Sequence, residues 1–135
     1  MRSDMNNQFF STIKTIAIVG LSNKPDRPSY EVGLYLKSKG FQIIPVNPNI
    51  TEWEGEKTYP RLSAIPKEIQ IDVVDIFRKS EEVLPIVNEA IDRRGIKAIW
   101  MQEGISNDEA ETLARNNGLQ VVSNMCMMKA HKSQL

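Results

Sequence analysis

The fold follows from one stretch near the amino end, Thr15-Ile16-Ala17-Ile18-Val19-Gly20. A short β-branched apolar run of this kind is typical of a strand that is buried on both faces, as parallel strands are. A loop with Pro25 and Pro28 follows, and these prolines exclude regular structure there. Apolar residues then recur at helical spacing to about Ser38, before a second strand at 41–46. This order of strand, helix and strand predicts one right-handed βαβ unit.

The same alternation continues along the chain. We expect further strands at 71–77, 98–102 and 119–122, with the helices between them ending near Gly95 and Gly118. The sequence therefore predicts an α/β fold over residues 1–135, in a single domain. The predicted sheet is doubly wound and Rossmann-like, with about five parallel strands at the centre of three α/β/α layers.

Three serines mark the predicted helix starts. Ser29 and Ser80 each stand before a helical pattern, and Ser106 has Glu109 three residues later, which is the spacing of a capping box. Each hydroxyl is expected to accept a hydrogen bond from a backbone N–H of the first turn.

The remaining segments carry weaker patterns. Residues 4–13 predict a short helix, and residues 47–66 a long surface loop. In that loop Trp53 and Tyr59 either form a lid over a ligand or anchor the loop to the body of the protein. The tail from Asn124 is rich in methionine and then polar, with no element predicted.

Composition limits the classes of partner. The chain has 17 Lys and Arg and 17 Asp and Glu, so its formal net charge is +0. This balance argues against a nucleic acid or an anionic membrane as the main partner, because both favour a basic excess. One cysteine, Cys126, excludes an intramolecular disulfide and a zinc quartet, and we predict no metal site.

Targeting segments are not evident either. No apolar run approaches the roughly 20 residues that span a bilayer, and residues 1–8 are polar, unlike a signal peptide. We therefore expect a cytoplasmic protein. A homodimer is plausible, because small α/β domains often pair through symmetric faces.

Doubly wound sheets bind ligands at the carboxyl ends of their strands. The loop after the first strand combines a glycine, small polar side chains, two cations and a helix start, namely Gly20, Ser22, Asn23, Lys24, Arg27 and Ser29. Such a set suits a ligand with more than one phosphate. The alternative is an ordinary connecting loop with two solvated basic residues.

Two common nucleotide motifs are absent. Gly20 is followed two and five positions later by Ser22 and Pro25, so the chain has no G-x-G-x-x-G fingerprint. The second strand ends in Val46-Asn47-Pro48, without the acidic residue that holds the ribose of NAD. A P-loop motif is also missing. These observations disfavour an NAD oxidoreductase and exclude a P-loop nucleotide triphosphatase.

Several blocks of sequence together resemble a bacterial and archaeal family of small CoA-binding proteins. The blocks are Ile16-Ala17-Ile18-Val19-Gly20-Leu21-Ser22, Lys24-Pro25-Asp26-Arg27-Pro28-Ser29-Tyr30, Ile44-Pro45-Val46-Asn47-Pro48, Val74-Asp75-Ile76-Phe77-Arg78 and Trp100-Met101-Gln102-Glu103-Gly104-Ile105. Such proteins are similar to the CoA-binding amino-terminal domain of the succinyl-CoA synthetase alpha subunit, standing alone.

The resemblance implies a ligand, coenzyme A or an acyl-CoA, and a role for each block. The first loop would hold the phosphates through Gly20, Ser22, Asn23, Lys24, Arg27 and Ser29. The nucleotide part would be lined by Val46, Asn47 and Pro48. Adenine or the pantetheine arm would lie beside Ile76, Phe77 and Arg78. The thiol end would lie near Gln102, Gly104 and Ile105.

Reactive groups are few. Cys126 and His131 form a possible nucleophile pair, although Cys126 among three methionines is explained more simply as an apolar filler. Glu103 is a better placed acid than Asp72 or Asp75, because it follows a strand directly.

The resemblance also implies what the chain lacks, because the synthetase needs a second domain with a phosphorylated histidine and an ATP-grasp partner. We therefore expect a carrier, sensor or accessory protein that binds CoA without catalysis. One alternative is a small enzyme that uses acyl-CoA or a nucleotide, with Glu103 or Cys126 as its reactive group. The other is an interaction module with a vestigial site.

Overall fold

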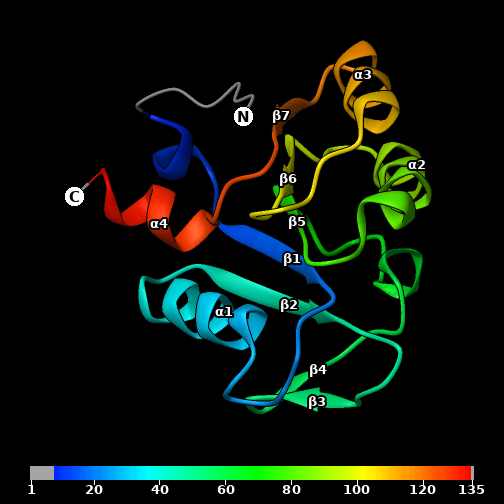
Figure 1. The fold of residues 1–135 in the computed structure, drawn as a ribbon. Helices are drawn as coiled ribbons and strands as arrows, with labels where there is room; N and C mark the ends of the chain where they lie inside the picture. The colour runs from blue at the N-terminus through cyan, green and yellow to red at the C-terminus, as the bar shows by residue number, and fades with distance from the viewer. Residues whose placement is uncertain (1–7, 135) are drawn as a thin grey trace.

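The computed structural model describes residues 8–134, and a five-stranded parallel sheet lies at its centre (Figure 1). The strand order is β2-β1-β5-β6-β7. The strands are β1 (Thr15–Val19), β2 (Gln42–Val46), β5 (Val73–Ile76), β6 (Ala98–Met101) and β7 (Gln120–Val122). All four pairings between neighbours are parallel, which confirms the predicted Rossmann-like sheet.

Helices cover both faces of this sheet (Figure 1). One face carries η1 (Phe9–Thr12), α1 (Pro28–Ser38) and α4 (Met127–Lys132), and the other carries α2 (Val83–Arg93) and α3 (Asp108–Asn116). Side chains alternate between the faces along each strand. In β1, Ile16 and Ile18 therefore pack against α1, while Ala17 packs toward α2. The outcome is three layers with two apolar cores, one on each side of the sheet.

The strand order reverses at β1, which pairs with β2 on one side and with β5 on the other. Val19, the last residue of β1, stands opposite Val46 of β2 and Ile76 of β5. The pairing continues one step beyond the strands, since the N–H of Gly20 donates to the carbonyl of Val46 and that of Phe77 to the carbonyl of Val19, both at 2.8 Å. Three loops therefore leave the sheet at one level, at the switch point where such folds bind ligands.

The segment 47–66 contains more structure than the predicted surface loop. It forms a hairpin of β3 (Glu52–Trp53) and β4 (Glu56–Lys57), followed by η2 (Leu62–Ala64). Glu54 and Gly55 both have positive φ, 47° and 79°, as a tight hairpin turn requires. The sequence hides this turn because Glu rarely adopts that conformation. Trp53 is fully buried, so it anchors the hairpin and is not a lid.

The carboxyl-terminal tail also gains an element that the sequence did not predict. The backbone N–H groups of Asn124 and Met125 donate to the carbonyls of Ile105 and Met101, in the loop after β6 and at the end of β6 itself, and α4 follows shortly after. The helix spans 6 residues, which is too short to be stable without packing. Its buried Met127 supplies that packing, against the same core as Trp100. Pattern reading misses such a helix because two turns give too little periodicity.

The predicted helix starts are each displaced. Arg27 is the N-cap of α1, and Pro28 is its first residue, so Ser29 lies inside the first turn. Lys79, not Ser80, precedes η3 (Ser80–Glu82), which leads into α2. Asn107, not Ser106, caps α3, where its side chain accepts from the N–H of Ala110 at 2.9 Å. Of the helix expected at 4–13, the described residues contain only the 3₁₀ helix η1, and residues 4–7 lie outside the described part.

Candidate functional site

Three adjoining pockets lie at the carboxyl ends of the strands. The first-loop pocket, of about 560 Å³, lies over the loop after β1; the α2 pocket, of about 380 Å³, lies beside α2; and the α4 pocket, of about 530 Å³, lies between α1 and α4. Gly20 lines the first two, Phe77 the first and third, and Arg78 the second and third. The three pockets therefore form one continuous site around the ends of β1 and β5.

The first-loop pocket brings together all six residues predicted to hold phosphates. Its lining consists of Gly20, Ser22, Asn23, Lys24, Arg27, Pro28, Ser29, Asn47, Asn49, Ile50 and Phe77. All six residues that the sequence selected from the first loop are in this set, together with Asn47. The structure therefore brings the six residues together around one pocket, and their binding of a ligand stays a prediction.

Side chains within the loop fix its path. The buried hydroxyl of Ser29 accepts the N–H of Ser22 at 2.9 Å, and the Ser22 hydroxyl accepts the N–H of Lys24 at 3.0 Å. The amide of Asn47 donates to the carbonyl of Leu21 at 3.0 Å, which ties the loop after β2 to the loop after β1. The hydroxyl of Ser29 thus shapes the loop instead of capping the helix, which explains why it is buried.

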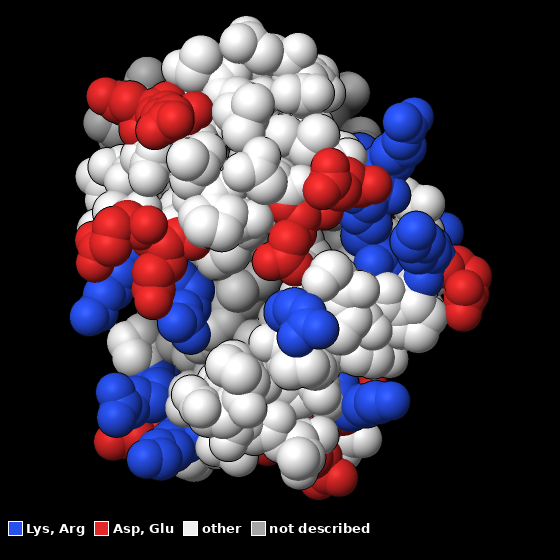
Figure 2. Space-filling view, turned by 90° about the vertical axis from the view of Figure 1, so that its right-hand side faces the viewer, with Lys and Arg blue, Asp and Glu red and all other residues white. Residues whose placement is uncertain are grey.

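The cations of this pocket are free to meet an anion. Within residues 8–134, Lys24 and Arg27 have no carboxylate partner, and both side chains are exposed. Pro28 at the first position of α1 leaves the N-terminal end of an 11-residue helix directed at the same pocket. Basic and acidic side chains are interspersed over the face seen in Figure 2. This face carries no broad basic surface, so an anion would be attracted by the two cations and the helix start of the loop itself.

The α2 pocket has a more apolar lining than the first-loop pocket. It is lined by Val19, Gly20, Val46, Pro48, Pro60, Arg61, Leu62, Arg78, Glu81, Glu82, Pro85, Ile86 and Glu89. The guanidinium of Arg78 makes two hydrogen bonds of 3.1 Å to the carboxylate of Glu82. This guanidinium lowers the pKa of Glu82 below its ordinary value. Arg78 thus has a fixed position at the border with the α4 pocket, with its plane held by two contacts.

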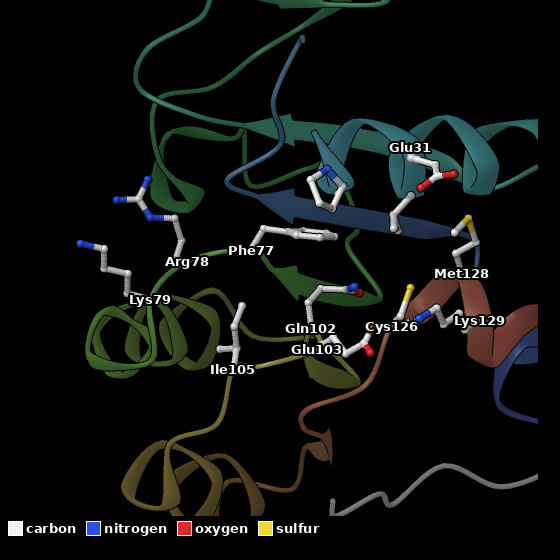
Figure 3. Close-up of a pocket in the computed structure, with 12 residues that line it drawn as sticks. Glu31, Phe77, Arg78, Lys79, Gln102, Glu103, Ile105, Cys126, Met128 and Lys129 are labelled. Carbon is white, nitrogen blue, oxygen red and sulfur yellow. Dashed lines mark hydrogen bonds and ion pairs between the residues drawn. The ribbon is translucent and has the colours of Figure 1, made fainter. Parts of the chain in front are cut away.

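The α4 pocket joins α1, α4 and the loops after β5 and β6 (Figure 3). Its lining is Pro28, Glu31, Val32, Phe77, Arg78, Lys79, Gln102, Glu103, Ile105, Cys126, Met128 and Lys129. At the rim, Lys129 and Glu103 form an exposed ion pair of 3.2 Å. Deeper inside, the Gln102 amide and the Cys126 sulfur point toward the same space (Figure 3). The pocket therefore has a charged rim and a largely apolar interior.

Two predicted site residues lie elsewhere. Ile76 is fully buried in the core beneath α2, because strand alternation turns it away from Phe77. Gly104 lines none of the three pockets, and its N–H donates to the side chain of Asn124 at 2.7 Å. Sequence reasoning missed the contribution of α4, since Met128 and Lys129 enter the site only through a helix that was not predicted.

The possible Cys126–His131 pair is not assembled. Cys126 lines the α4 pocket, whereas His131 packs edge-on against Phe10 and Phe41 and its Nδ1 lies 2.7 Å from the Tyr35 hydroxyl. Burial, with a smaller contribution from Lys39, lowers the pKa of His131. In the part of the chain that is described, no cluster of His, Cys, Asp or Glu is arranged to hold a metal ion. His131 therefore packs among aromatic side chains on the face of the sheet that carries α1 and α4.

Comparison with known proteins agrees with this geometry. A family model described as a CoA binding domain matches residues 14–132. The chain belongs to this CoA-binding family. The match includes every residue of the three pockets. The predicted relation to small stand-alone CoA-binding proteins is thereby confirmed.

The relatives differ in size: some are about as long as this chain, and others are much larger. Bacillus subtilis YneT is 40% identical over 118 residues, which make up 87% of this chain and 85% of YneT. A hypothetical protein from Pyrococcus horikoshii OT3 superposes with a TM-score of 0.89 at 36% identity, covering 99% of this chain and 96% of that chain. The ADP-forming acetate–CoA ligase II of Archaeoglobus fulgidus is 30% identical over 108 residues, but these are only 15% of the ligase. The CoA-binding family thus includes proteins of this size and is related to one part of a much larger ligase.

Across residues 8–134, no helix combines the length and the apolar character that crossing a bilayer requires.

Proposed function

We propose that this protein binds coenzyme A or an acyl-CoA across the three pockets, as a carrier, sensor or accessory protein. The observation that carries the proposal is the first-loop pocket, where Lys24 and Arg27 lie beside the start of α1 with no carboxylate partner among residues 8–134. Anionic ligands are stabilised by such a combination of cations and helix N-terminus. Membership of a CoA-binding family supports the choice of CoA among phosphate ligands.

The pockets suit the successive parts of CoA. The phosphates would occupy the first-loop pocket, where the charges and small polar side chains lie. The adenosine part suits the α2 pocket, because apolar walls such as Pro48 and Ile86 favour a flat ring and the fixed guanidinium of Arg78 can stack on it. The pantetheine arm would pass Phe77 into the α4 pocket, which has the apolar interior that a flexible chain needs. Gly20, Phe77 and Arg78 each line two pockets, so each would contact two neighbouring parts of CoA.

Binding without catalysis is the role that these residues support best. The α4 pocket holds Glu103 and Cys126, but Glu103 is paired with Lys129 and Cys126 has no histidine beside it in the described structure. Acid–base and nucleophilic catalysis both need a group held within reach of a proton partner. The match to the acetate–CoA ligase relative covers only 15% of that ligase, so its ligase activity is not carried over to this chain.

Calorimetric titration with CoA, dephospho-CoA and NAD tests the proposal. CoA is expected to bind with micromolar affinity and more tightly than dephospho-CoA, since the latter lacks the 3′-phosphate. Arg27→Ala and Lys24→Ala should each weaken CoA binding by about 10-fold or more, as loss of a charge-assisted contact costs about 1.5–3 kcal/mol. Lys67→Ala, which removes one exposed charge outside the three pockets, is the matched control and should leave the affinity unchanged. Equal or tighter binding of NAD, or no binding of any of the three ligands, would overturn the proposal.

A further inference from the structure

Cys126 is presented to the α4 pocket on a backbone segment that is held on both sides. The N–H of Met125 donates to the carbonyl of Met101 at 3.2 Å, and the indole N–H of Trp100 donates to the carbonyl of Met125 at 2.8 Å. On the other side, the N–H of Met127 donates to Oε1 of Gln102 at 3.0 Å. Cys126 is 7% exposed as a residue, and its side chain is therefore held at the wall of the pocket.

Gln102 gives a second and independent indication of a ligand at the same place. Its side chain is almost completely buried and lines the α4 pocket, where it points toward the sulfur of Cys126 (Figure 3). Oε1 is occupied by the N–H of Met127, but Nε2 has no acceptor among residues 8–134. Nε2 is not among the fully buried polar atoms that lack a partner, so it borders the open space of the pocket. A bound molecule with a carbonyl oxygen close to the thiol of Cys126 can therefore accept a hydrogen bond from it.

The pantetheine end of CoA has this chemistry, with an amide carbonyl followed by a two-carbon arm and a thiol. The first-loop and α4 pockets share Pro28 and Phe77, so a ligand whose phosphates lie at Lys24 and Arg27 can extend directly toward Cys126. The rim pair Glu103–Lys129 is 62% and 68% exposed, which leaves the mouth of the pocket open to solvent. A group leaving the thiol end therefore has a way out.

We propose that Cys126 is a redox-responsive site that captures CoA as a reversible mixed disulfide. The inference rests on the proposed CoA binding and adds a covalent state to it. The reactant is CoA disulfide, with one half seated in the three pockets. The Cys126 thiolate attacks the sulfur of the seated half, a Cys126–CoA S–S bond forms and the S–S bond of CoA disulfide breaks. The other half leaves as a thiolate and takes up the proton lost by Cys126, so the exchange is balanced without a further oxidant.

Intact-mass measurement of the full-length protein tests this step. The protein is incubated with CoA disulfide or, in parallel, with glutathione disulfide, which has the same reactive bond but no nucleotide. Cys126 is the single cysteine of the chain, so any thiol-reversible adduct is located unambiguously. We expect one CoA per chain, removed by dithiothreitol, and formed at least about 10-fold faster than the glutathione adduct, because seating raises the effective concentration of the disulfide. Arg27→Ala should slow labelling by CoA disulfide and leave labelling by glutathione disulfide unchanged.

The result that overturns the inference differs from the one that overturns CoA binding. If calorimetry shows CoA binding to the wild type and to Cys126→Ser, but CoA disulfide labels no faster than glutathione disulfide, the covalent state is wrong and the binding function stands. Labelling by CoA disulfide that is indifferent to Arg27→Ala has the same meaning. If CoA does not bind and its disulfide shows no advantage, both proposals fail together.

Discussion

The α-carbon of Gly20 packs directly against the carbonyl oxygen of Phe77, with no room for a β-carbon between them. Gly20 also has a φ of +90°, which side chains rarely tolerate. This contact brings the loop after β1 against the loop after β5, at the point where all three pockets meet. The shape of the site thus depends on a missing side chain, and the same glycine ends the stretch that decides the fold.

Replacing that glycine is predicted to damage both stability and binding. Gly20→Ala adds a β-carbon that collides with backbone at Phe77 and keeps a strained φ. Overpacking of this kind typically costs about 1–3 kcal/mol, in addition to about 1–3 kcal/mol of backbone strain. Urea unfolding should show the loss of stability, and calorimetry should show weaker CoA binding, because the two loops must move apart.

Gly118→Ala is the matched control for this prediction. Gly118 has a comparable φ of +82°, but a β-carbon there meets nothing within 4 Å. Gly118→Ala therefore measures the cost of backbone strain without a steric clash, and it should leave CoA binding unchanged. Equal losses of stability in the two variants would show that the contact with Phe77 is relaxed in solution.

The fold was predictable because strands buried on both faces leave short, largely apolar and β-branched runs in the sequence. The runs that end at Val19, Val46 and Ile76 predict the carboxyl edge of the sheet. The first-loop residues were selected as site candidates because they follow that edge. Ile76 was wrong as a lining residue for a simple reason, since the residues beyond a strand end still alternate and only Phe77 faces α1 and α4.

Local signals failed where tertiary contacts outweigh propensity. Ser29 has the right chemistry for an N-cap, but its hydroxyl serves the loop at Ser22, and Pro28 begins the helix one residue earlier. The turn at Glu54 and Gly55 has a glycine at its second position, but Glu54 at the first position gives no turn signal, and the adjoining Trp53 is buried by tertiary packing. α4 is held in place by hydrogen bonds to Gln102 and to neighbouring backbone. Because these contacts come from distant residues, the short sequence of α4 does not predict the helix.

Trp53 allows the role of an anchor to be separated from that of a lid. The indole packs T-shaped on Tyr30 with ring centroids 6.0 Å apart, and Nε1 has no hydrogen-bond acceptor in the described structure. Trp53→Ala is predicted to lower the free energy of unfolding by about 3–5 kcal/mol, the cost of removing a buried aromatic ring. Trp53→Phe should cost less than about 2 kcal/mol, because it keeps a ring and loses no hydrogen bond. Loss of CoA binding in Trp53→Ala without a loss of stability would instead indicate a lid.

Asp75 is predicted to reduce the stability of the folded protein at neutral pH. It lies in the central strand β5 between Ile18 and Trp100, fully buried, and neither carboxylate oxygen has a hydrogen-bond partner in the described structure. Burial raises its pKa well above the ordinary 3.8, opposed only by the nearby backbone N–H of Ile76. We expect Asp75→Val to stabilise the fold at pH 7 by about 1–3 kcal/mol, the usual cost of an unpartnered buried polar group.

The sign of the pH dependence gives an independent test of Asp75. Because the folded pKa is raised, the unfolded chain loses this proton first as pH rises through about 4, and the wild type is destabilised from there upward. The stability advantage of Asp75→Val over the wild type should therefore grow from pH 4 to pH 7, by up to about 1.4 kcal/mol per pH unit. Urea unfolding across this range measures it. A variant less stable than the wild type at pH 7 would mean that the carboxyl has a polar partner in solution.

His131 is predicted to make stability fall on the acid side of neutrality. Its folded pKa is lowered from 6.5 by burial and by Lys39, so the unfolded chain takes up the proton first. The contribution of the neutral ring is therefore complete above about pH 6.5 and is lost as pH falls through that value. Since His131 is the single histidine, His131→Gln removes imidazole titration altogether. Thermal unfolding at pH 7.5 and 5.5 should show a larger drop for the wild type than for His131→Gln. An equal or larger drop in the variant would show that protonation at His131 is not opposed by its place among Phe10, Tyr35 and Phe41.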